Sequence, residues 1–410
     1  MQPESVVSPY VGVVRGIEDG LAAPDGARLA AAWCESAHPR VVVGSGSGET
    51  AREARAAALG EALERYSASL PDPDRLIVAS ARELGARAVD PLRFALFSKR
   101  QYGSAGFPYT RFDRETRLAW VEGVALPGGE PAFVPAQLVH LAGFDDETPL
   151  CRTTSSGLAC HTTVESATLG ALLEVLERDA FMLTWKTRLS WPLLEWSGNA
   201  ELEAFERASL RPTGLHWRAV DLSAIWEVPI VAAVVRGGET LGVGAAAAAT
   251  VRRAATKALD EATRVRTWAQ ALRRSGAAAP AADAVEELDD HVRFYSDPVN
   301  APRVDFLDCC RATRRIEHVP DVSAPLLPSI CERLARRGFT AYAVEVTSPD
   351  VREAGMHVVR AIAPELCALD VEHRARLHGG RRLYEEPRRL GRADRVLAED
   401  DLNPDPHPFP

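Results

Sequence analysis

The sequence predicts a mixed α/β fold, and two observations support this prediction. Stretches with strand-like alternation are interleaved with long segments of helical period, which is typical of α/β proteins. One phrase, Glu-x-x-Glu-Arg, also occurs twice, starting at Glu61 and at Glu174, each time on a predicted helix. The two copies lie more than 100 residues apart, so they indicate an internal repeat of one element and not a solenoid. Two similar halves facing a shared cleft are the simplest use of such a repeat.

The first copy follows a predicted strand and a Gly/Ser turn, residues 41–50. Thr50 is a candidate N-cap for a helix over 51–69, and Glu53 stands where a capping box requires an acidic residue. Leu59, Leu63 and Tyr66 recur at steps of three and four residues and form one helix face.

The remaining elements follow from period and turn chemistry. A further strand is predicted in 6–17 near the N-terminus, and strand-like pieces fill much of 105–142. Residues 153–163 read as a small-residue turn, and 275–284 as a loop. The other predictions are helices over 164–184 and 250–273, a hairpin over 228–247 around Gly237 and Gly238, and strands over 339–348 and 357–364.

Composition excludes several function classes. The chain has 410 residues, a net charge of −9 and no basic block, so binding to nucleic acid through a cationic surface is not expected. It shows neither a signal peptide nor a stretch of about 18 apolar residues, and a cytoplasmic protein is expected. Seven cysteines without a C-x-x-C pair support neither a zinc site nor a disulfide framework.

The repeated phrase suits a divalent cation. Residues three apart on a helix share a face, so Glu61 and Glu64 point together, as do Glu174 and Glu177. Magnesium takes oxygen ligands and usually combines one or two carboxylates with substrate phosphates. The alternative is a solvated helix face with local ion pairs. The turn at 44–50 is not a P-loop, because it lacks the terminal Lys-Ser/Thr.

Longer motifs resemble one family. "TSSGLACHTTVESATLGALLEVLERDAFMLTW", residues 154–185, is similar to the core signature of YcaO-domain proteins. "GSGSGETAREARAAALGEALERYSA" resembles that family's first helix, and "QYGSAGFPYTRFD" with "WVEGVALPGGEPAFVPAQLV" resembles its middle. The ending "LNPDPHPFP" resembles the tail of the azoline-forming cyclodehydratase branch, the D proteins of thiazole/oxazole-modified peptide biosynthesis. The resemblance covers nearly the whole chain.

The resemblance implies a YcaO-like fold, with sheets flanked by long helices around a cleft for ATP and Mg²⁺. It also implies site residues. By position, Glu61, Glu64, Glu174 and Glu177 would be Mg²⁺ ligands. The tail prolines Pro406, Pro408 and Pro410 would assist catalysis, on an arm that prolines keep rigid and extended. Nucleotide-binding positions would be Ser47, Arg65, Ser155, Ser156, Gly157, Arg178, Glu261 and Arg360.

Several of these positions have plainer explanations. Glu261 would pair with Arg264 or Lys257 on the helix surface, and Arg360 would be an edge charge of a strand. Ser155 and Ser156 would be turn residues, His161 a structural residue at the start of a helix, and the Pro-rich tail an undocked linker.

The chain also departs from the family pattern at five places. This chain has Ser47 where the family often has Lys, Ala57 where it has Ser, and Thr162 where it has Asn. It has Ser166 where the family often has the second residue of an acidic pair, and Arg264 where Gln is common. These changes put the metal count, the rate or catalysis itself in doubt.

The resemblance further implies one composite catalytic domain, 1–400, made of halves 1–145 and 146–400, with the tail at 401–410. The substrate would be a ribosomal precursor peptide. No peptide-recognition winged helix precedes the first motif, so the expected partner is a leader-binding protein of the ubiquitin-activating-enzyme-like class. A flavin azoline dehydrogenase would act afterwards, and a homodimer is expected, with no nucleic acid or membrane partner.

Three functions fit the sequence. The first is an ATP-dependent cyclodehydratase that converts Cys, Ser or Thr of a precursor peptide to thiazolines or oxazolines. The second is the related thioamidation or amidine formation. The third is a catalytically degenerate subunit that binds ATP or peptide.

Overall fold

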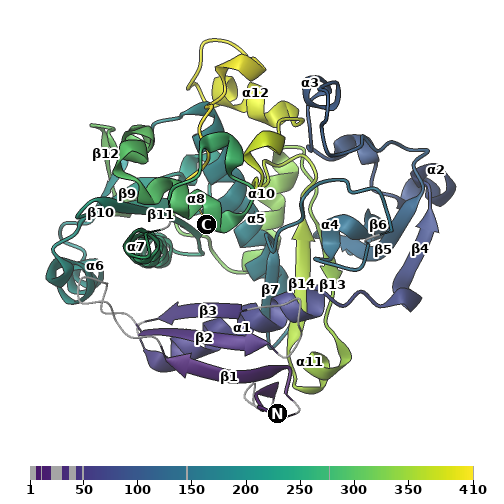
Figure 1. The fold of residues 1–410 in the computed structure, drawn as a ribbon, viewed down its shortest axis with the longest axis horizontal. Helices are drawn as coiled ribbons and strands as arrows, with labels where there is room; N and C mark the ends of the chain where they lie inside the picture. The colour runs from purple at the N-terminus through teal and green to yellow at the C-terminus, as the bar shows by residue number, and fades with distance from the viewer. Residues whose placement is uncertain are drawn as a thin grey trace. The chain divides into compact units, whose positions relative to one another are not determined.

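The structure is a computed structural model, and it describes residues 6–10, 12–19, 30–36, 43–48, 50–144, 146–276 and 278–409. The chain divides into two compact units. Figure 1 shows the helices and strands with their labels. Unit 1 takes Met1–Leu21, Leu29–Val175 and Leu327–Leu366, and unit 2 takes Ala22–Arg28, Leu176–Leu326 and Cys367–Pro410. In the part of the chain that the structure describes, no helix is long and apolar enough to cross a membrane.

The first sheet of unit 1 has three antiparallel strands and is covered by a helix. The strands are β1 (Val14–Asp19), β2 (Ala30–Ser36) and β3 (Val43–Gly48), in that order, and the helix is α1 (Ala51–Ala68). A Cβ atom on Gly44 would lie far inside van der Waals contact with the Ala58 carbonyl oxygen and 2.5 Å from the Ala62 nitrogen. Glycine here therefore lets the strand lie directly on the helix backbone.

The start of α1 confirms the predicted cap. The Thr50 side chain accepts a hydrogen bond from the Glu53 N–H, and the Glu53 carboxylate accepts one from the Thr50 N–H, so both halves of a capping box are present. The buried face of the helix consists mostly of alanine and leucine, which allows the close approach to β3.

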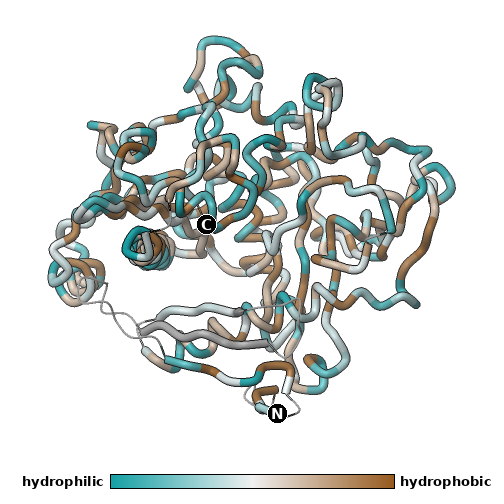
Figure 2. The backbone as a smooth tube through the Cα atoms, in the orientation of Figure 1, coloured by the Kyte–Doolittle hydropathy of each residue, from teal (hydrophilic) through white to brown (hydrophobic). Residues whose placement is uncertain are grey.

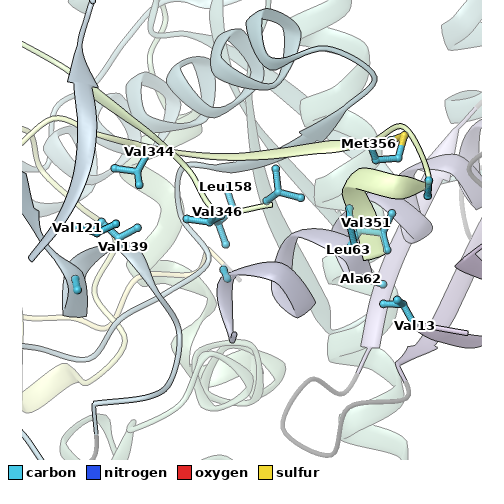
Figure 3. Close-up of a cluster of buried hydrophobic side chains, with 14 of the residues drawn as sticks. Val13, Ala62, Leu63, Val121, Val139, Leu158, Val344, Val346, Val351 and Met356 are labelled. Atoms are coloured by element: carbon cyan, nitrogen blue, oxygen red, sulfur yellow. The ribbon is translucent and has the colours of Figure 1, made fainter. Parts of the chain in front are cut away.

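The second sheet of unit 1 has six strands: β4 (Leu76–Ala79), β5 (Leu118–Ala125), β6 (Pro131–Pro135), β7 (Leu158–His161), β13 (Tyr342–Glu345) and β14 (His357–Ile362). Their order is β4-β5-β13-β14-β7, and β6 also pairs with β5. The outer strand β4 is strongly apolar (Figure 2). Figure 3 shows a core of unit 1, in which Leu63 of α1 lies near Val351 and Met356, and Val121 and Val344 of this sheet belong to the same cluster.

Unit 2 is built on a five-stranded sheet covered by a long helix. Its strands are β8 (Leu193–Glu195), β9 (His216–Asp221), β10 (Ile230–Gly237), β11 (Thr240–Ala247) and β12 (Thr313–Arg315). The order is β11-β10-β9-β8-β12, and α7 (Val251–Arg274) packs on β10 and β11. Alanines and leucines of α7 form one core with valines of the sheet.

Helix α5 (Val164–Thr187) begins in unit 1 and ends in unit 2. The shorter helices of unit 1 are α2 (Ala81–Leu84), α3 (Lys99–Tyr102), α4 (Ala136–Val139), α10 (Leu326–Arg336, whose first residue is counted in unit 2) and α11 (Pro349–Glu353). Those of unit 2 are α6 (Ala200–Phe205), α8 (Leu288–Ser296), α9 (Asp305–Asp308) and α12 (Arg381–Arg389).

Most of the predicted elements are confirmed, including the three long helices and the hairpin β10–β11. The prediction that 153–163 is only a turn is wrong, because residues 158–161 form β7 and pair with β14. The partner strand lies almost 200 residues further along the chain, so no local pattern announces it. Six cysteines are free thiols, as expected, and the Cys34 side chain lies outside the described residues.

The compact units differ from the predicted halves 1–145 and 146–400. The boundary between them falls at Val175, inside α5, and Leu327–Leu366 returns to unit 1. The return follows from strand pairing, since β13 pairs with β5 and β14 pairs with β7.

Candidate functional site

The Glu61 carboxylate accepts hydrogen bonds from strand β3 and from an arginine of α1. One carboxylate oxygen accepts hydrogen bonds from the Ser45 N–H of β3 at 2.5 Å and from the Ser45 hydroxyl at 3.0 Å. The other oxygen accepts one from Arg65 at 2.6 Å, one turn further along α1. Arg65, which the resemblance gives as a nucleotide-binding position, therefore contacts the Glu61 carboxylate within unit 1.

Glu64 and Glu174 form a like-charge pair in unit 1. Glu64 is half-buried and accepts a hydrogen bond from the Cys160 N–H of β7 at 2.7 Å. Burial, followed by the negative charge of Glu174, raises the pKa of Glu64 well above its ordinary value, and Glu61 adds to the shift. A cation at these two carboxylates would remove this penalty, so the pair is suited to a metal ion.

The loop before β7 is shaped by Arg360. This arginine is only 6% exposed, and its guanidinium donates to the Thr154 carbonyl at 2.7 Å. Gly157, at φ 78°, accepts a hydrogen bond from the Ala361 N–H at 2.7 Å, and Ser156 bonds to the Thr154 hydroxyl. The structure thus places Arg360 with the predicted Ser155–Gly157 segment. Arg360 lies within the sheet and is not an exposed edge charge. Ser47 lies half-buried on β3.

In unit 2, two glutamates bind one edge of the sheet. Glu177 of α5 accepts a hydrogen bond from the Ala247 N–H at 2.9 Å, and Glu261 of α7 accepts one from the Ala245 N–H at 2.8 Å. These two amides lie two residues apart on the outer strand β11, so they point in the same direction. Glu261 is thus tied to the sheet and is not merely a surface partner of Lys257.

Arginines of unit 2 offset part of the cost of burying the Glu261 carboxylate. Burial raises its pKa, whereas the charge of Arg264, the Ala245 N–H and the charge of Arg178 oppose the rise. Arg178 also lies over the Phe409 ring, with 5.7 Å between the guanidinium carbon and the ring centroid. The predicted nucleotide residues Arg178 and Glu261 are therefore close enough to interact.

Asp179 is a buried residue of this segment that the sequence analysis missed. Its carboxylate is fully buried and accepts hydrogen bonds from Arg382 at 2.7 Å, from the Trp226 indole at 2.8 Å and from the Cys367 N–H at 2.8 Å. It directly follows the second Glu-x-x-Glu-Arg phrase, and a charge at the start of the apolar run 180–183 was the available signal. Its contacts fix the rotation of α5 at Glu177 and Arg178.

The Pro-rich tail is docked in unit 2 and is not an undocked linker. Its residues from Asp405 to Phe409 are buried, Tyr295 donates to the Pro406 carbonyl at 2.6 Å, and Phe409 packs on Phe181. Of the three predicted catalytic prolines, Pro406 and Pro408 are described within this segment, and Pro410 lies outside the described residues.

The two strand–helix modules correspond at an interval of 200 residues. Gly44, Ser45, Thr50 and Glu61 in unit 1 match Gly244, Ala245, Thr250 and Glu261 in unit 2. Each threonine caps its helix, and each glutamate accepts the strand amide. The sequence analysis missed this second repeat, although the constant interval was a readable signal.

The donor set fits magnesium and a nucleotide. Every predicted metal ligand is a carboxylate, the ligand type that Mg²⁺ prefers. Among the described residues, no group of three or more His, Cys, Asp or Glu side chains meets to hold a metal alone. A Mg²⁺ ion shared with phosphate oxygens needs only one or two carboxylates, so the arrangement suits a metal that arrives with ATP.

Comparisons with known proteins agree with this class. The family described as "YcaO cyclodehydratase, ATP- and Mg²⁺-binding" matches residues 45–367. An uncharacterized protein of Methanothermobacter thermautotrophicus is 28% identical over 357 residues, which are 81% of this chain and 83% of that protein.

Solved structures share the fold. A heterocyclase in complex with substrate and cofactor has a TM-score of 0.83 at 22% identity, and the heterocyclase TruD has 0.69 at 25%. The matches cover 100% and 87% of this chain but 58% and 50% of those chains, so this chain spans little more than half of each heterocyclase. YcaO from Methanopyrus kandleri, bound with AMPPCP and Mg²⁺, has 0.61 at 22% identity, with 86% of both chains covered.

The fold is of mixed α/β architecture, and the family match indicates a class of proteins that bind ATP and Mg²⁺. The chain belongs to the YcaO family, whose cofactors are ATP and Mg²⁺.

Proposed function

We propose that the chain is an ATP-dependent cyclodehydratase that forms thiazolines or oxazolines in a ribosomal precursor peptide. The observation that carries the proposal is the Glu64–Glu174 pair, a buried repulsion that a phosphate-bound cation would relieve. Two similar structures that are named heterocyclases, and a tail docked beside Arg178, support azoline formation over other YcaO reactions.

The proposed reaction is a phosphoryl transfer to a peptide oxygen. A Cys, Ser or Thr side chain attacks the preceding amide carbonyl, and the resulting oxygen takes the γ-phosphoryl group of ATP, which leaves ADP. The S–H or O–H proton of the attacking side chain leaves to solvent as the bond forms, and loss of phosphate together with the amide proton then gives the C=N bond of the ring. Such transfers require positioning and charge neutralisation and little covalent chemistry from the protein.

Each predicted residue has a role in this proposal. Glu61, Glu64, Glu174 and Glu177 hold Mg²⁺, which neutralises phosphate charge when bound. Arg65 and Arg178 orient carboxylates or meet phosphate oxygens. Arg360 holds the loop in which Ser155, Ser156 and Gly157 line the nucleotide site, with Ser47 and Glu261 as further contacts, and the tail with Pro406, Pro408 and Pro410 assists proton transfer.

The proposed partners are the precursor peptide and a leader-binding protein of the ubiquitin-activating-enzyme-like class. A flavin azoline dehydrogenase would act on the product. We also propose that the chain works as a homodimer.

The test is reconstitution with a precursor peptide, the partner protein, ATP and Mg²⁺. Mass spectrometry is expected to show the loss of one water per ring, with matching release of ADP and phosphate. Glu174→Gln is expected to abolish both. Glu332→Gln provides the control, because Glu332 is an exposed helical glutamate of unit 1 with a 69% exposed side chain. Ring formation at the full rate by Glu174→Gln would refute the metal assignment.

The same experiment separates the alternatives. Exchange of oxygen for sulfur in the peptide would identify thioamidation, and water loss with a cyclic amidine in fragment spectra would identify amidine formation. Ring formation by the partner alone, with no ATP binding to this chain, would identify a degenerate subunit, which the departures at Ser47 and Ser166 would explain.

A further inference from the structure

The C-terminal segment Leu402–Phe409 is held in unit 2 as a ligand is held in a groove. It contains neither helix nor strand after residue 401, yet most of its residues are buried. Its backbone therefore cannot be satisfied by a sheet ladder, and the groups that satisfy it must come from side chains and loops.

Side chains of unit 2 contact four carbonyl groups of the segment. Three elements supply them: α5, α8 and the loop before α12. Arg376 donates to the Asn403 carbonyl at 2.5 Å, Trp185 to that of Asp405 at 3.2 Å and Tyr295 to that of Pro406 at 2.6 Å. The His291 Nδ1 lies 2.8 Å from the His407 carbonyl oxygen and its Nε2 lies 2.8 Å from that of Val371, and a neutral ring donates to one of the two. The groove thus contacts main-chain acceptors along the length of the segment.

The alternating prolines suit this mode of recognition. Pro404, Pro406 and Pro408 have no N–H, so burying them leaves only carbonyl groups to be satisfied. One of the remaining amides, that of Asn403, donates to the Lys186 carbonyl at 2.7 Å. A segment of ordinary residues would bring three more N–H groups into the same space.

His407 anchors the segment. Its ring stacks on His291 with 3.8 Å between centroids, and its Nε2 donates to the Asp370 carbonyl at 2.8 Å. The wall beneath contains the buried ion pair of Lys186 and Asp370, at 2.8 Å. The ring is therefore held by stacking and by Nε2, while Nδ1 is buried with no hydrogen-bond partner among the described residues.

We propose that unit 2 carries a recognition groove for extended Pro-x-Pro peptides, with His291, Tyr295, Trp185 and Arg376 as its reading side chains. The resident ligand is the chain's own C-terminal segment, which docks reversibly and is anchored by His407. The inference requires neither ATP nor the proposed reaction, so either can fail without the other.

The experiment uses the full chain and a His407→Ala variant. Hydrogen exchange followed by mass spectrometry reports the amides of 403, 405, 407 and 409. Loss of the stacked ring and its hydrogen bond is expected to speed their exchange on the order of tenfold, with β9–β11 unchanged. Unchanged exchange in the tail would overturn the proposal.

A labelled peptide, LNPDPHPFP, then tests recognition in trans by fluorescence anisotropy. It is expected to bind His407→Ala at least about tenfold more tightly than the wild type, whose tethered tail competes at a high effective concentration. The same peptide with alanine for histidine is expected to bind neither protein. Equal binding of the two peptides, or no binding to His407→Ala, would refute the groove.

A second variant keeps the test decisive if His407→Ala does not fold. Tyr295→Phe removes only the hydroxyl that donates to Pro406 and keeps the ring. Its tail amides are expected to exchange about fivefold faster than those of the wild type, the loss of one hydrogen bond. If the tail amides of Tyr295→Phe exchanged at the wild-type rate, the Pro406 carbonyl would not be recognised by Tyr295.

Discussion

The β3–α1 module of unit 1 and the β11–α7 module of unit 2 share one strand–helix arrangement but differ in the charges around their glutamates. In both, a glycine brings the strand onto the helix, and a glutamate at the same helical position accepts the next strand amide. The modules diverge one turn later, where unit 1 has Glu64 and unit 2 has Arg264.

The difference shows how one scaffold gives two kinds of acidic site. In unit 1 the charges of Glu174 and Glu61 add to the rise that burial imposes on the pKa of Glu64, and the Cys160 N–H and the charge of Arg65 oppose it only in part. In unit 2 the pKa of Glu261 is also raised by burial, but the charges of Arg264 and Arg178 are among the main opposing causes, so more of the negative charge is offset without metal. Mg²⁺ should therefore stabilise unit 1 strongly against unfolding and the corresponding module of unit 2 weakly.

Glu64→Gln is expected to have the largest effect. It removes a proposed metal ligand, and the rate should fall on the order of 10²–10³-fold, which corresponds to a few kcal/mol of transition-state stabilisation. Without Mg²⁺ the same variant should melt at a higher temperature than the wild type, because the repulsion with Glu174 is gone. Thermal unfolding with and without Mg²⁺ checks both signs. A variant less stable than the wild type without Mg²⁺ would contradict the comparison.

The second largest effect is expected for alanine at Gly44 or at Gly244, the glycines that correspond in the two modules. A Cβ atom on Gly44 would overlap the Ala58 carbonyl oxygen, and one on Gly244 would lie 2.6 Å from the Ala262 nitrogen. Both variants should lose roughly 1–3 kcal/mol of unfolding free energy, Gly44→Ala more than Gly244→Ala. Denaturant unfolding measures the loss. Gly60→Ala is the control, because nothing lies within 4 Å of its added Cβ. Equal stability of all three would show that close strand–helix contact is not required.

Acid should destabilise unit 2 more than unit 1. Burial lowers the pKa of His373 to about 4 and of His378 to about 3, and also lowers those of His291 and His407, all in unit 2. Among the described residues of unit 1, the one histidine with a pKa lowered in this way is His140, at about 4.

In the unfolded chain these histidines take up a proton near pH 6.5, whereas in the folded protein they stay neutral to a lower pH. Their contribution to the unfolding free energy is therefore fully present above pH 6.5 and is lost as the pH falls towards 4. Each histidine contributes roughly 1.4 kcal/mol per pH unit in this window. The raised pKa of Glu64 acts in the opposite direction in unit 1. Melting curves from pH 7.5 to 5.5, with first proteolytic cuts mapped by mass spectrometry, should show unit 2 opening first. First cuts in unit 1 would break the comparison.

The smallest effect is expected for Arg264→Glu, which gives unit 2 the acidic pair of unit 1. Losing the charge of Arg264 should raise the pKa of Glu261 further and cost about 1 kcal/mol of unfolding free energy without metal. Added Mg²⁺ should recover part of this loss. Calorimetric unfolding is the measurement, and Arg264→Gln is the control. The control separates the effect of a reversed charge at this position from the effect of losing the arginine charge alone. No response of Arg264→Glu to Mg²⁺ would limit the cation site to unit 1.

Local rules in the sequence predicted the long helices but not the assembly of the units. The cap of α1 at Thr50 and the helical periods of α5 and α7 are short-range signals, and they were read correctly. Strand β7 and the return of Leu327–Leu366 to unit 1 depend on pairing across nearly 200 residues, which no window of sequence contains. Strands of three residues, such as β8 and β12, are too short to show a period.

The candidate site divides in the same way. Residue types and spacing pointed to the glutamates, but their partners are mostly backbone amides, which carry no sequence signature. The buried contacts of Asp179 likewise come from Trp226, Cys367 and Arg382, all distant in the chain.

The bonds from Ala245 and Ala247 also satisfy two backbone donors that no neighbouring strand reaches. β11 is the outer strand of its sheet and all of its residues are buried, so an open amide there would have neither a strand nor water to accept from it. Glu177 and Glu261 accept from two of these amides. Glutamine keeps an acceptor oxygen at either position, whereas alanine would leave a buried N–H without an acceptor and lower the unfolding free energy by roughly 1–3 kcal/mol.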